Sequence, residues 1–179
     1  SPEECLNSTL PAAADKRQPL AESAEKGLRD LLQYCKDEGL TNVVFARFPH
    51  IVTERTYDRF ERSNTVCDIV EEYGFDYLNF ERDIAMTGLK EDEDFYNNDH
   101  LNINGQRKFT AFLTDYLMDN YTVVRHALND SQRAEWETCA AYYDAYARMS
   151  EHMIETKDMK EISEDWILIE ELEEYLTES

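Results

Sequence analysis

The chain has 179 residues, which is the usual size of one domain and enough to bury a hydrophobic core. Hydrophobic residues make up 42% of it, so it is not an intrinsically disordered chain, although charged residues reach 32%. Acidic residues outnumber basic ones by 39 to 18. The net charge of -21 argues against nucleic acid and anionic membranes as partners, because phosphate groups are bound through clustered cations.

Membrane insertion, metals and cofactors are not expected from the sequence. No apolar run approaches the roughly 20 residues that span a bilayer. Residues Ser1–Cys5 lack the basic start and apolar stretch of a signal peptide, which leaves the compartment open. The four cysteines lack the spacing of zinc ligands, and we interpret them as reduced thiols, with disulfides as the alternative because their number is even: Cys5, Cys35, Cys67 and Cys139.

A helix followed by a strand occurs twice in the N-terminal half, after an irregular segment over residues 1–18. The expected elements are a helix from about Pro19 to Gly39, a strand over 42–49, a helix over 57–73 and a strand over 75–80. Apolar residues at helical spacing support the first helix, namely Leu28, Leu31, Leu32 and Cys35. This order predicts a parallel α/β sheet covered by helices.

Three further helices are expected in the C-terminal half. The first follows a long loop over 81–104 and ends near residue 121, with an apolar stripe for the core at Phe109, Phe112, Leu113, Tyr116 and Leu117. Acidic helices over about 130–156 and 163–178 follow. The predicted division is an N-terminal segment 1–18, an α/β domain 19–128 and a helical extension 129–179.

The number of predicted strands is too small for a domain of this length. A sheet of two parallel strands is not expected to be stable alone, and an ordinary domain has more of its residues in strands. Either residues 1–18 hide further strands, or the chain is a piece of a larger α/β domain. We favour the second interpretation.

Polar residues gather in two segments that follow predicted strands, where parallel sheets carry their functional groups. Residues 48–50 end in His50, and the loop 81–104 holds His100 together with three carboxylates, Asp92, Asp94 and Asp99. A histidine beside a carboxylate can act as a general base, because the carboxylate orients the ring and stabilises the imidazolium. The alternative is turn and capping chemistry, in which Asn102 or Asn104 caps the next helix.

The sequence of residues 94–110, DFYNNDHLNINGQRKFT, resembles the C-terminal Asp-x-x-His block of the SGNH/GDSL hydrolase superfamily. It is most similar to the cell-envelope, acyltransferase-like branch of Gram-positive bacteria, where the block often reads like DFYDxxHLNxxGAxKFT. Residues 31–49 and 64–80 resemble the two preceding helix–strand units, and 121–126 followed by Trp136 resembles the family's ending. The resemblance covers about residues 25–137 and implies part of a flavodoxin-like parallel sheet.

The resemblance implies roles for residues of this block. His100 matches the histidine that activates a serine nucleophile, and Asn97 stands where the family has the aspartate that orients the ring. Asparagine can hold the ring but supplies no charge, so Asp94 and Asp99 are further candidates for the acid. The family's nucleophilic serine lies in a Gly-x-Ser block between a strand and a helix. The following serines lack such a setting: Ser8, Ser23, Ser63, Ser131, Ser150, Ser163 and Ser179.

By this resemblance, the chain is the C-terminal, histidine-bearing portion of a serine esterase or O-acyltransferase. Its substrates would be acylated cell-envelope glycans or polymers outside the cytoplasm, and its serine would lie on an N-terminal half or another protein. The alternative is a non-catalytic binding or scaffold module that kept the fold. In that case the acidic C-terminal helices would dock a basic partner.

The remaining histidines and the C-terminal aromatic residues have less specific surroundings. His50 could line the same cleft but is interpreted as a loop residue, and His126 and His152 as surface or partly packed residues. Four aromatic residues could stack on a sugar, although their helical spacing favours a core or a helix–helix contact: Trp136, Tyr142, Tyr143 and Tyr146.

Overall fold

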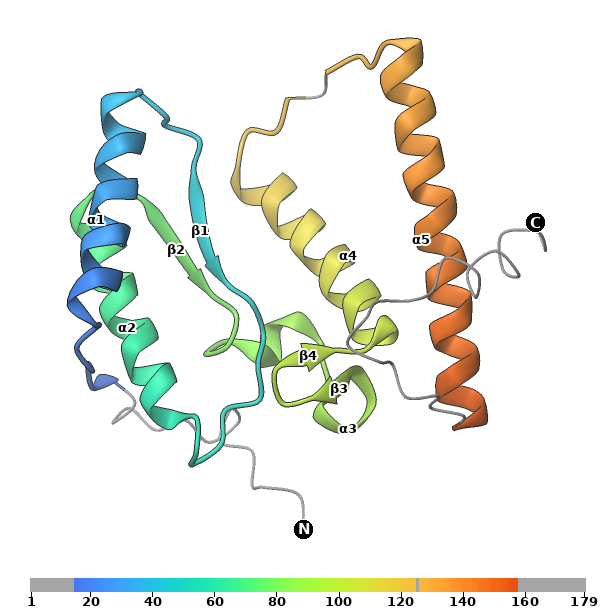
Figure 1. Cartoon of the computed structure of the whole chain (residues 1–179), viewed down its shortest axis with the longest axis horizontal. Coiled ribbons are helices and arrows are strands. Elements are labelled where there is room, and N and C mark those ends of the chain that lie inside the picture. The colour runs from blue at the N-terminus through green and yellow to red at the C-terminus, as the bar shows by residue number, and fades with distance from the viewer. Residues whose placement is uncertain (1–14, 125, 158–179) are drawn as a thin grey trace. The chain divides into compact units, whose positions relative to one another are not determined.

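The computed structural model describes residues 15–124 and 126–157 of the chain (Figure 1). Its elements are α1 (Glu22–Asp37), β1 (Val44–Arg47), α2 (Tyr57–Glu72), β2 (Asp76–Asn79), the 3-10 helix η3 (Ile84–Thr87), α3 (Glu91–Asp94), β3 (Phe95–Asn97), β4 (His100–Leu101), α4 (Ile103–Asn120) and α5 (Asp130–Thr156). The chain divides after Phe109 into two compact units. Many helices and a small parallel sheet confirm the predicted α/β class.

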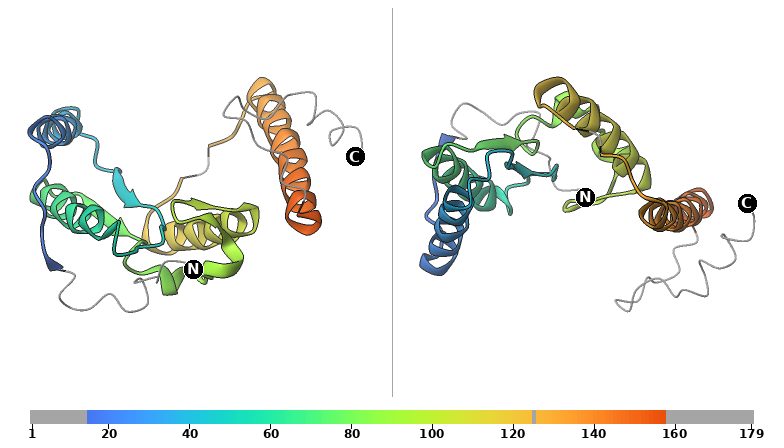
Figure 2. Two further views of the ribbon diagram at one scale, coloured as in Figure 1. Left: turned by 60° about the horizontal axis from the view of Figure 1, so that its bottom comes forward. Right: turned by 90° about the horizontal axis from the view of Figure 1, so that it is seen from above.

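The first unit is built on the parallel pair of β1 and β2, which are in register over their full length. Phe45 of β1 and Tyr77 of β2 pack against the core between α1 and α2, which contains Leu32, Ile69 and Val70. Figures 1 and 2 show both helices on the same side of the sheet. The predicted arrangement of two helix–strand units with parallel strands is therefore confirmed.

The other face of this sheet is covered at one end. Ala46 and Leu78 point to this face by the alternation of side chains along a strand, and Ala46 is exposed while Leu78 is half-buried. At the carboxyl ends of the strands, Phe109 of α4 packs edge-on against Phe48 and Phe80, with ring centroids 5.4 and 5.3 Å apart. Parallel sheets are normally covered on both faces, so the exposed Ala46 marks a part of this face that no described residue covers.

Helix α1 begins three residues after the expected start at Pro19. The reason is a set of tertiary bonds to α2. The backbone N–H of Gln18 donates to the carbonyl oxygen of Glu61, and the Gln18 carbonyl oxygen accepts a hydrogen bond of 2.7 Å from the hydroxyl of Thr65. These bonds hold Gln18 against α2, so that the residues directly after it do not join α1. Gly39 ends α1 as predicted, with a positive φ of 66°.

Residues 81–104 contain more structure than the long loop that the sequence predicts. They form η3, α3 and an antiparallel hairpin of β3 and β4, in which Asn97 lies opposite His100. Each of these elements has four residues or fewer, which is too short for a periodic pattern of apolar residues. The expected loop therefore contains short regular elements that the sequence did not predict.

Helix α5 of the second unit lies where the sequence predicts it. Its start is fixed by a capping box, in which the side chain of Asn129 accepts from the backbone N–H of Gln132 and the Gln132 side chain accepts from the N–H of Asn129. Residues 126–144 are all exposed. The expectation of a core or a helix–helix contact is therefore wrong for three of the aromatic residues, Trp136, Tyr142 and Tyr143, which all lie in this stretch.

The apolar stripe of α4 is covered less than the sequence predicts. Phe109 is buried, whereas the other four members, Phe112, Leu113, Tyr116 and Leu117, are half-buried. The expected helix over 163–178 and the possible strands before residue 15 lie outside the described residues. Within the described parts of the chain, no helix is both long enough and apolar enough to cross a membrane.

Candidate functional site

The candidate site lies on the β3–β4 hairpin, directly before α4. Asn97 ends β3 and His100 begins β4, so that Asn98 and Asp99 form the tip between them. The backbone N–H of Ile51, in the loop after β1, donates a hydrogen bond of 2.8 Å to the carbonyl oxygen of Asn98. This bond ties the tip of the hairpin to the segment that leaves the carboxyl end of β1.

The structure brings His100 and Asn97 together, with Nδ1 of His100 2.9 Å from Oδ1 of Asn97. The same Oδ1 accepts a hydrogen bond of 2.9 Å from the backbone N–H of Asp99. Because a backbone N–H can only donate, this second bond fixes the carbonyl oxygen of Asn97, rather than its NH₂ group, toward the ring. Nδ1 must then carry the proton of the neutral ring, and Nε2 carries the lone pair of a base.

The second ring nitrogen of His100, Nε2, lies on an exposed side chain. The side chain of His100 is exposed, and its Nε2 has no bonding partner within residues 15–124 and 126–157. One ring nitrogen is thus held by an orienting oxygen, while the other is open to a proton donor. This is the arrangement of a general base.

The two carboxylates predicted near the histidine have other partners. Asp99 forms an exposed ion pair with Arg59 of α2, in which Oδ1 and Nη2 are 3.1 Å apart. Asp94 is fully buried, and Nζ of Lys108 lies 2.8 Å from its Oδ1. The backbone N–H of Lys90 donates to its Oδ2, also at 2.8 Å. Of the four predicted site residues, the structure therefore brings together Asn97 and His100.

Asp94 joins the base of the hairpin to α4. Its carbonyl oxygen accepts a hydrogen bond of 3.0 Å from the backbone N–H of Asn102. Asn102 caps α4, since its Oδ1 accepts from the backbone N–H of Gly105 at 3.0 Å. A Cβ atom at Gly105 would overlap the carbonyl oxygen of Asp94, so this position requires glycine. The predicted capping role is confirmed for Asn102, and it coexists with the pair of Asn97 and His100.

A second cluster, which the sequence analysis did not predict, lies at the carboxyl ends of β1 and β2. The guanidinium of Arg47 donates to both oxygens of the buried Glu81 carboxylate, at 3.1 and 3.3 Å. Nδ1 of His50 lies 2.7 Å from the carbonyl oxygen of Phe48 and 3.7 Å from the Glu81 carboxylate. Arg47 is the last residue of β1, and Glu81 follows the end of the neighbouring parallel strand β2 by two residues. This position at the carboxyl ends of the strands is the signal in the sequence that could have identified the pair.

The protonation of His50 is controlled by its surroundings. Burial and the charge of Arg47 lower its pKa below the ordinary value of 6.5, whereas the negative charge of Glu81 acts in the opposite direction. Its interpretation as a loop residue is correct in position, since it lies between β1 and α2. His50 is therefore a half-buried residue held beside an ion pair, unlike the exposed His126 and His152.

None of the serines that the structure describes is a hydrogen-bond partner of His100. Ser23 lies in α1, and Ser131 and Ser150 lie in α5. Ser63 of α2 is buried, and its Oγ is 3.1 Å from the hydroxyl oxygen of Tyr77. None of the described serines is therefore placed for activation by His100 in this structure.

The described cysteines Cys35, Cys67 and Cys139 carry free thiols, as the sequence predicts, and Cys5 lies outside the described residues. Burial, assisted by a bond to Glu71, raises the pKa of Cys67 to about 11, which makes this thiol a poor nucleophile at neutral pH. In residues 15–124 and 126–157, no three His, Cys, Asp or Glu side chains are grouped in a way that could hold a metal ion.

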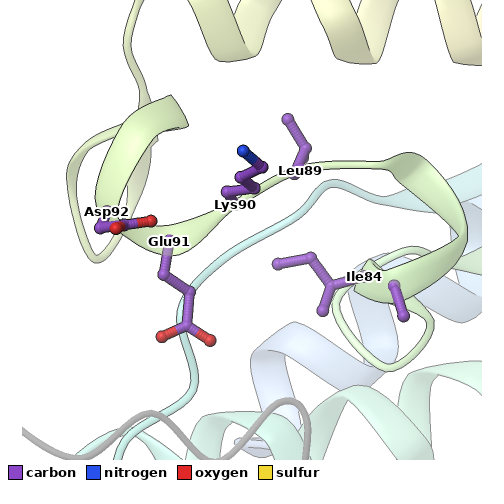
Figure 3. Close-up of a pocket in the computed structure, with 6 residues that line it drawn as sticks. Ile84, Leu89, Lys90, Glu91 and Asp92 are labelled. Carbon is purple, nitrogen blue, oxygen red and sulfur yellow. The ribbon is translucent and has the colours of Figure 1, made fainter.

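An open hollow of about 360 Å³ lies in the segment before the hairpin (Figure 3). Its apolar wall is formed by Ile84, Ala85 and Leu89, and its charged side chains are Lys90, Glu91 and Asp92. Asp92, which the sequence grouped with His100, therefore lies on the wall of this hollow. The pair of Asn97 and His100 is not part of its lining.

Comparisons of the chain with known protein families, with curated protein sequences and with solved structures find no match.

Proposed function

We propose that this chain is the histidine-bearing portion of an SGNH/GDSL-type serine esterase or O-acyltransferase. Its proposed substrates are acylated glycans or polymers of the cell envelope. The observation that carries the proposal is the pair of Asn97 and His100, in which Nδ1 lies 2.9 Å from Oδ1 of Asn97 and the histidine side chain is exposed. The pair stands after a parallel strand and before a helix, where the family that residues 94–110 resemble has its histidine.

In the proposed reaction, Nε2 of His100 removes the proton from a serine hydroxyl as the serine oxygen attacks the ester carbonyl carbon. The same nitrogen then gives the proton to the leaving alcohol, and the acyl group remains on the serine until water or another hydroxyl accepts it. Asn97 keeps the ring oriented, because its Oδ1 is fixed by the N–H of Asp99. A neutral amide stabilises the imidazolium less than a carboxylate would, so we expect a modest rate.

The serine is proposed to come from a separate segment, either an N-terminal half or another protein. The open face of the β1–β2 sheet supports this proposal. Ala46 of β1 is exposed on that face, although parallel strands are normally covered on both sides. A segment that contributes further strands and helices would cover this face and could carry a serine to the carboxyl ends of the strands.

The proposal is tested by mixing the chain with a segment from the same genome that carries a strand, a Gly-x-Ser sequence and a helix. Hydrolysis of p-nitrophenyl acetate and labelling of serine by a fluorophosphonate are measured. We expect activity in the mixture, its loss in His100→Ala and its retention in His152→Ala, which changes another exposed histidine. Labelling of a serine in this chain alone would contradict a nucleophile located elsewhere.

The role of Asn97 is tested in the same mixture. Asn97→Asp restores a charge beside the ring, and we expect it to raise kcat by about tenfold, because the carboxylate stabilises the imidazolium in the transition state. Asn97→Ala removes the orienting oxygen and should lower kcat. If Asn97→Asp and Asn97→Ala have the same kcat, Asn97 does not orient the base.

A non-catalytic binding or scaffold module is the second candidate function. Two observations favour it, namely an amide in place of the family's acid and a long exposed stretch at residues 126–144. On this alternative, no mixture with a serine-containing segment hydrolyses the ester, and His100→Ala leaves partner binding unchanged. The mixing experiment therefore separates the two candidates.

A further inference from the structure

The first half of α5, Asp130–Asp144, is a regular helix that packs against nothing described in the structure. Every residue in it is exposed, and Trp136 exposes 66% of its surface. An isolated helix of this length is marginally stable in water, because its stability normally comes from packing of an apolar face. The capping box at Asn129 supports the start of the helix but does not bury any of its side chains.

One face of this half is apolar. Trp136, Ala140 and Tyr143 are spaced at i, i+4 and i+7, which places them in one stripe along the helix. Tyr143 exposes 45% of its surface, and neither aromatic ring stacks on another described ring. Large aromatic residues of this kind dominate the energetics of protein–protein contacts. The stripe, defined as Trp136, Ala140 and Tyr143, is thus a surface suited to a second helix.

The charges beside the stripe indicate the chemistry of its partner. Three carboxylates flank the stripe: Glu137 and Asp144 lie along one side, beside Arg133, and Glu135 lies along the other, as their helical spacing requires. None of the three forms an ion pair with a described residue, although the chain contains several i,i+4 pairs elsewhere, such as Lys26 with Asp30. With three carboxylates against the single Arg133, the flanks of the stripe are acidic overall and complement a helix that has its own apolar stripe between basic residues.

We propose that the first half of α5 is a docking site for a basic amphipathic helix of a partner protein. The segment Asp130–Asp144 contains four acidic residues and one arginine, so a second copy of it would be repelled by its net negative charge. Residues 158–179 contain nine acidic residues and one lysine, so the chain's own C-terminal segment has the wrong charge as well. This inference is independent of the proposed hydrolytic function, because none of its residues belongs to the hairpin.

The test uses the full chain with Trp166→Phe, which leaves Trp136 as its single tryptophan. Three synthetic helical peptides of about 18 residues are titrated: Lys flanking a Leu stripe, Lys flanking a Ser stripe, and Glu flanking a Leu stripe. We expect saturable binding of the first, seen as a blue shift of Trp136 emission, and at least tenfold weaker binding of the other two. Salt should weaken the binding of the first, since it screens the flanking charges.

Variants of the chain locate the site. Binding of the Lys–Leu peptide is then followed by anisotropy of a dye on the peptide. The double variant Trp136→Ala, Tyr143→Ala should weaken it about tenfold or more. The double variant Glu135→Gln, Glu137→Gln should weaken the binding of the Lys–Leu peptide. It should not weaken the binding of the Glu–Leu peptide. The matched control is Tyr34→Ala with Tyr96→Ala, two exposed tyrosines outside α5, and it should leave the affinity unchanged.

Several outcomes would overturn the proposal. The first is failure of the Lys–Leu peptide to bind, and the second is equal binding of the Lys–Ser peptide, which would mean attraction by charge alone. Concentration-dependent dimers that disappear in Trp136→Ala would identify a second copy as the occupant. Emission of Trp136 that is already blue-shifted in the free monomer would show that the chain covers its own stripe.

Discussion

The β3–β4 hairpin and the first half of α5 are both polar segments with aromatic residues, but they are held in place very differently. In the hairpin, Asn97 bonds to a backbone N–H and to His100, while Asp94 bonds to Lys108. In the first half of α5, residues 130–144 have no buried side chain at all. The proposed base is thus held in one orientation by local bonds, whereas the proposed docking surface has no such bonds and is fully exposed.

The largest effect is expected from Gly105→Ala, at the contact between the hairpin and α4. Because a Cβ there would overlap the carbonyl oxygen of Asp94, the variant must move the hairpin or the helix. We expect the free energy of unfolding to fall by about 3 kcal/mol, measured by chemical denaturation. The control is Gly27→Ala in α1, where a Cβ meets nothing within 4 Å and should stabilise by roughly 0.5 to 1 kcal/mol. Equal effects of the two changes would contradict the tight contact.

A smaller effect is expected from Lys108→Met, which leaves the buried Asp94 carboxylate without its cation. Because Lys108 is itself partly exposed, we expect a loss of about 2 kcal/mol rather than the full cost of a buried unpaired charge. Lys26→Met removes an exposed ion pair with Asp30 and should not change stability measurably. If Lys108→Met is equally neutral, the ion pair does not anchor the hairpin.

The cluster of Arg47, Glu81 and His50 should make stability depend on pH through His50. Its pKa is lowered in the folded chain by burial and by Arg47, so the unfolded chain takes up a proton first as the pH falls below about 6.5. The free energy of unfolding should therefore decrease over the interval below pH 6.5. His50→Gln should remove this decrease, and His152→Gln, which changes an exposed histidine, should keep it. If the free energy of unfolding of His50→Gln still decreases below pH 6.5, another group causes the decrease.

Two carboxylates should affect stability in a separate range of pH. Hydrogen bonds from Arg62 and Arg17 lower the pKa values of Asp58 and Asp68, respectively, below the ordinary value of 3.8. Their contribution is present above that pH and is lost as the pH falls further. The effect of His50 can therefore be measured between pH 5 and 7 without interference from these two groups.

The smallest effect on stability is expected from Trp136→Ala. Its side chain is exposed, so its removal should leave the free energy of unfolding unchanged within error. Amide hydrogens of Asp130–Asp144 should exchange faster than those of α2, because α2 contains the buried Phe60, Ile69 and Val70. Slow exchange in the first half of α5, or a large loss of stability in Trp136→Ala, would mean that the helix is part of a core.

The sequence predicted most of the helices and both parallel strands, because their apolar spacing and terminal glycines depend on residues that are close along the chain. Gly39 and Gly74 end α1 and α2 with positive φ angles, and α5 begins and ends where its pattern does. The start of α1 and the β3–β4 hairpin were not predicted. The first is decided by bonds from Gln18 to α2, and the second consists of strands too short to have a pattern.

For the candidate site, the sequence by itself determined which residues stand together, since Asn97 and His100 are three positions apart in one turn. It could not determine whether Asp94, six positions before His100, or Asp99, which adjoins it, serves the histidine. The tertiary structure decided this by pairing Asp94 with Lys108 and Asp99 with Arg59. It also decided that Trp136 is exposed rather than buried. Helical spacing defines an apolar face, but only the position of the other elements determines whether anything covers it.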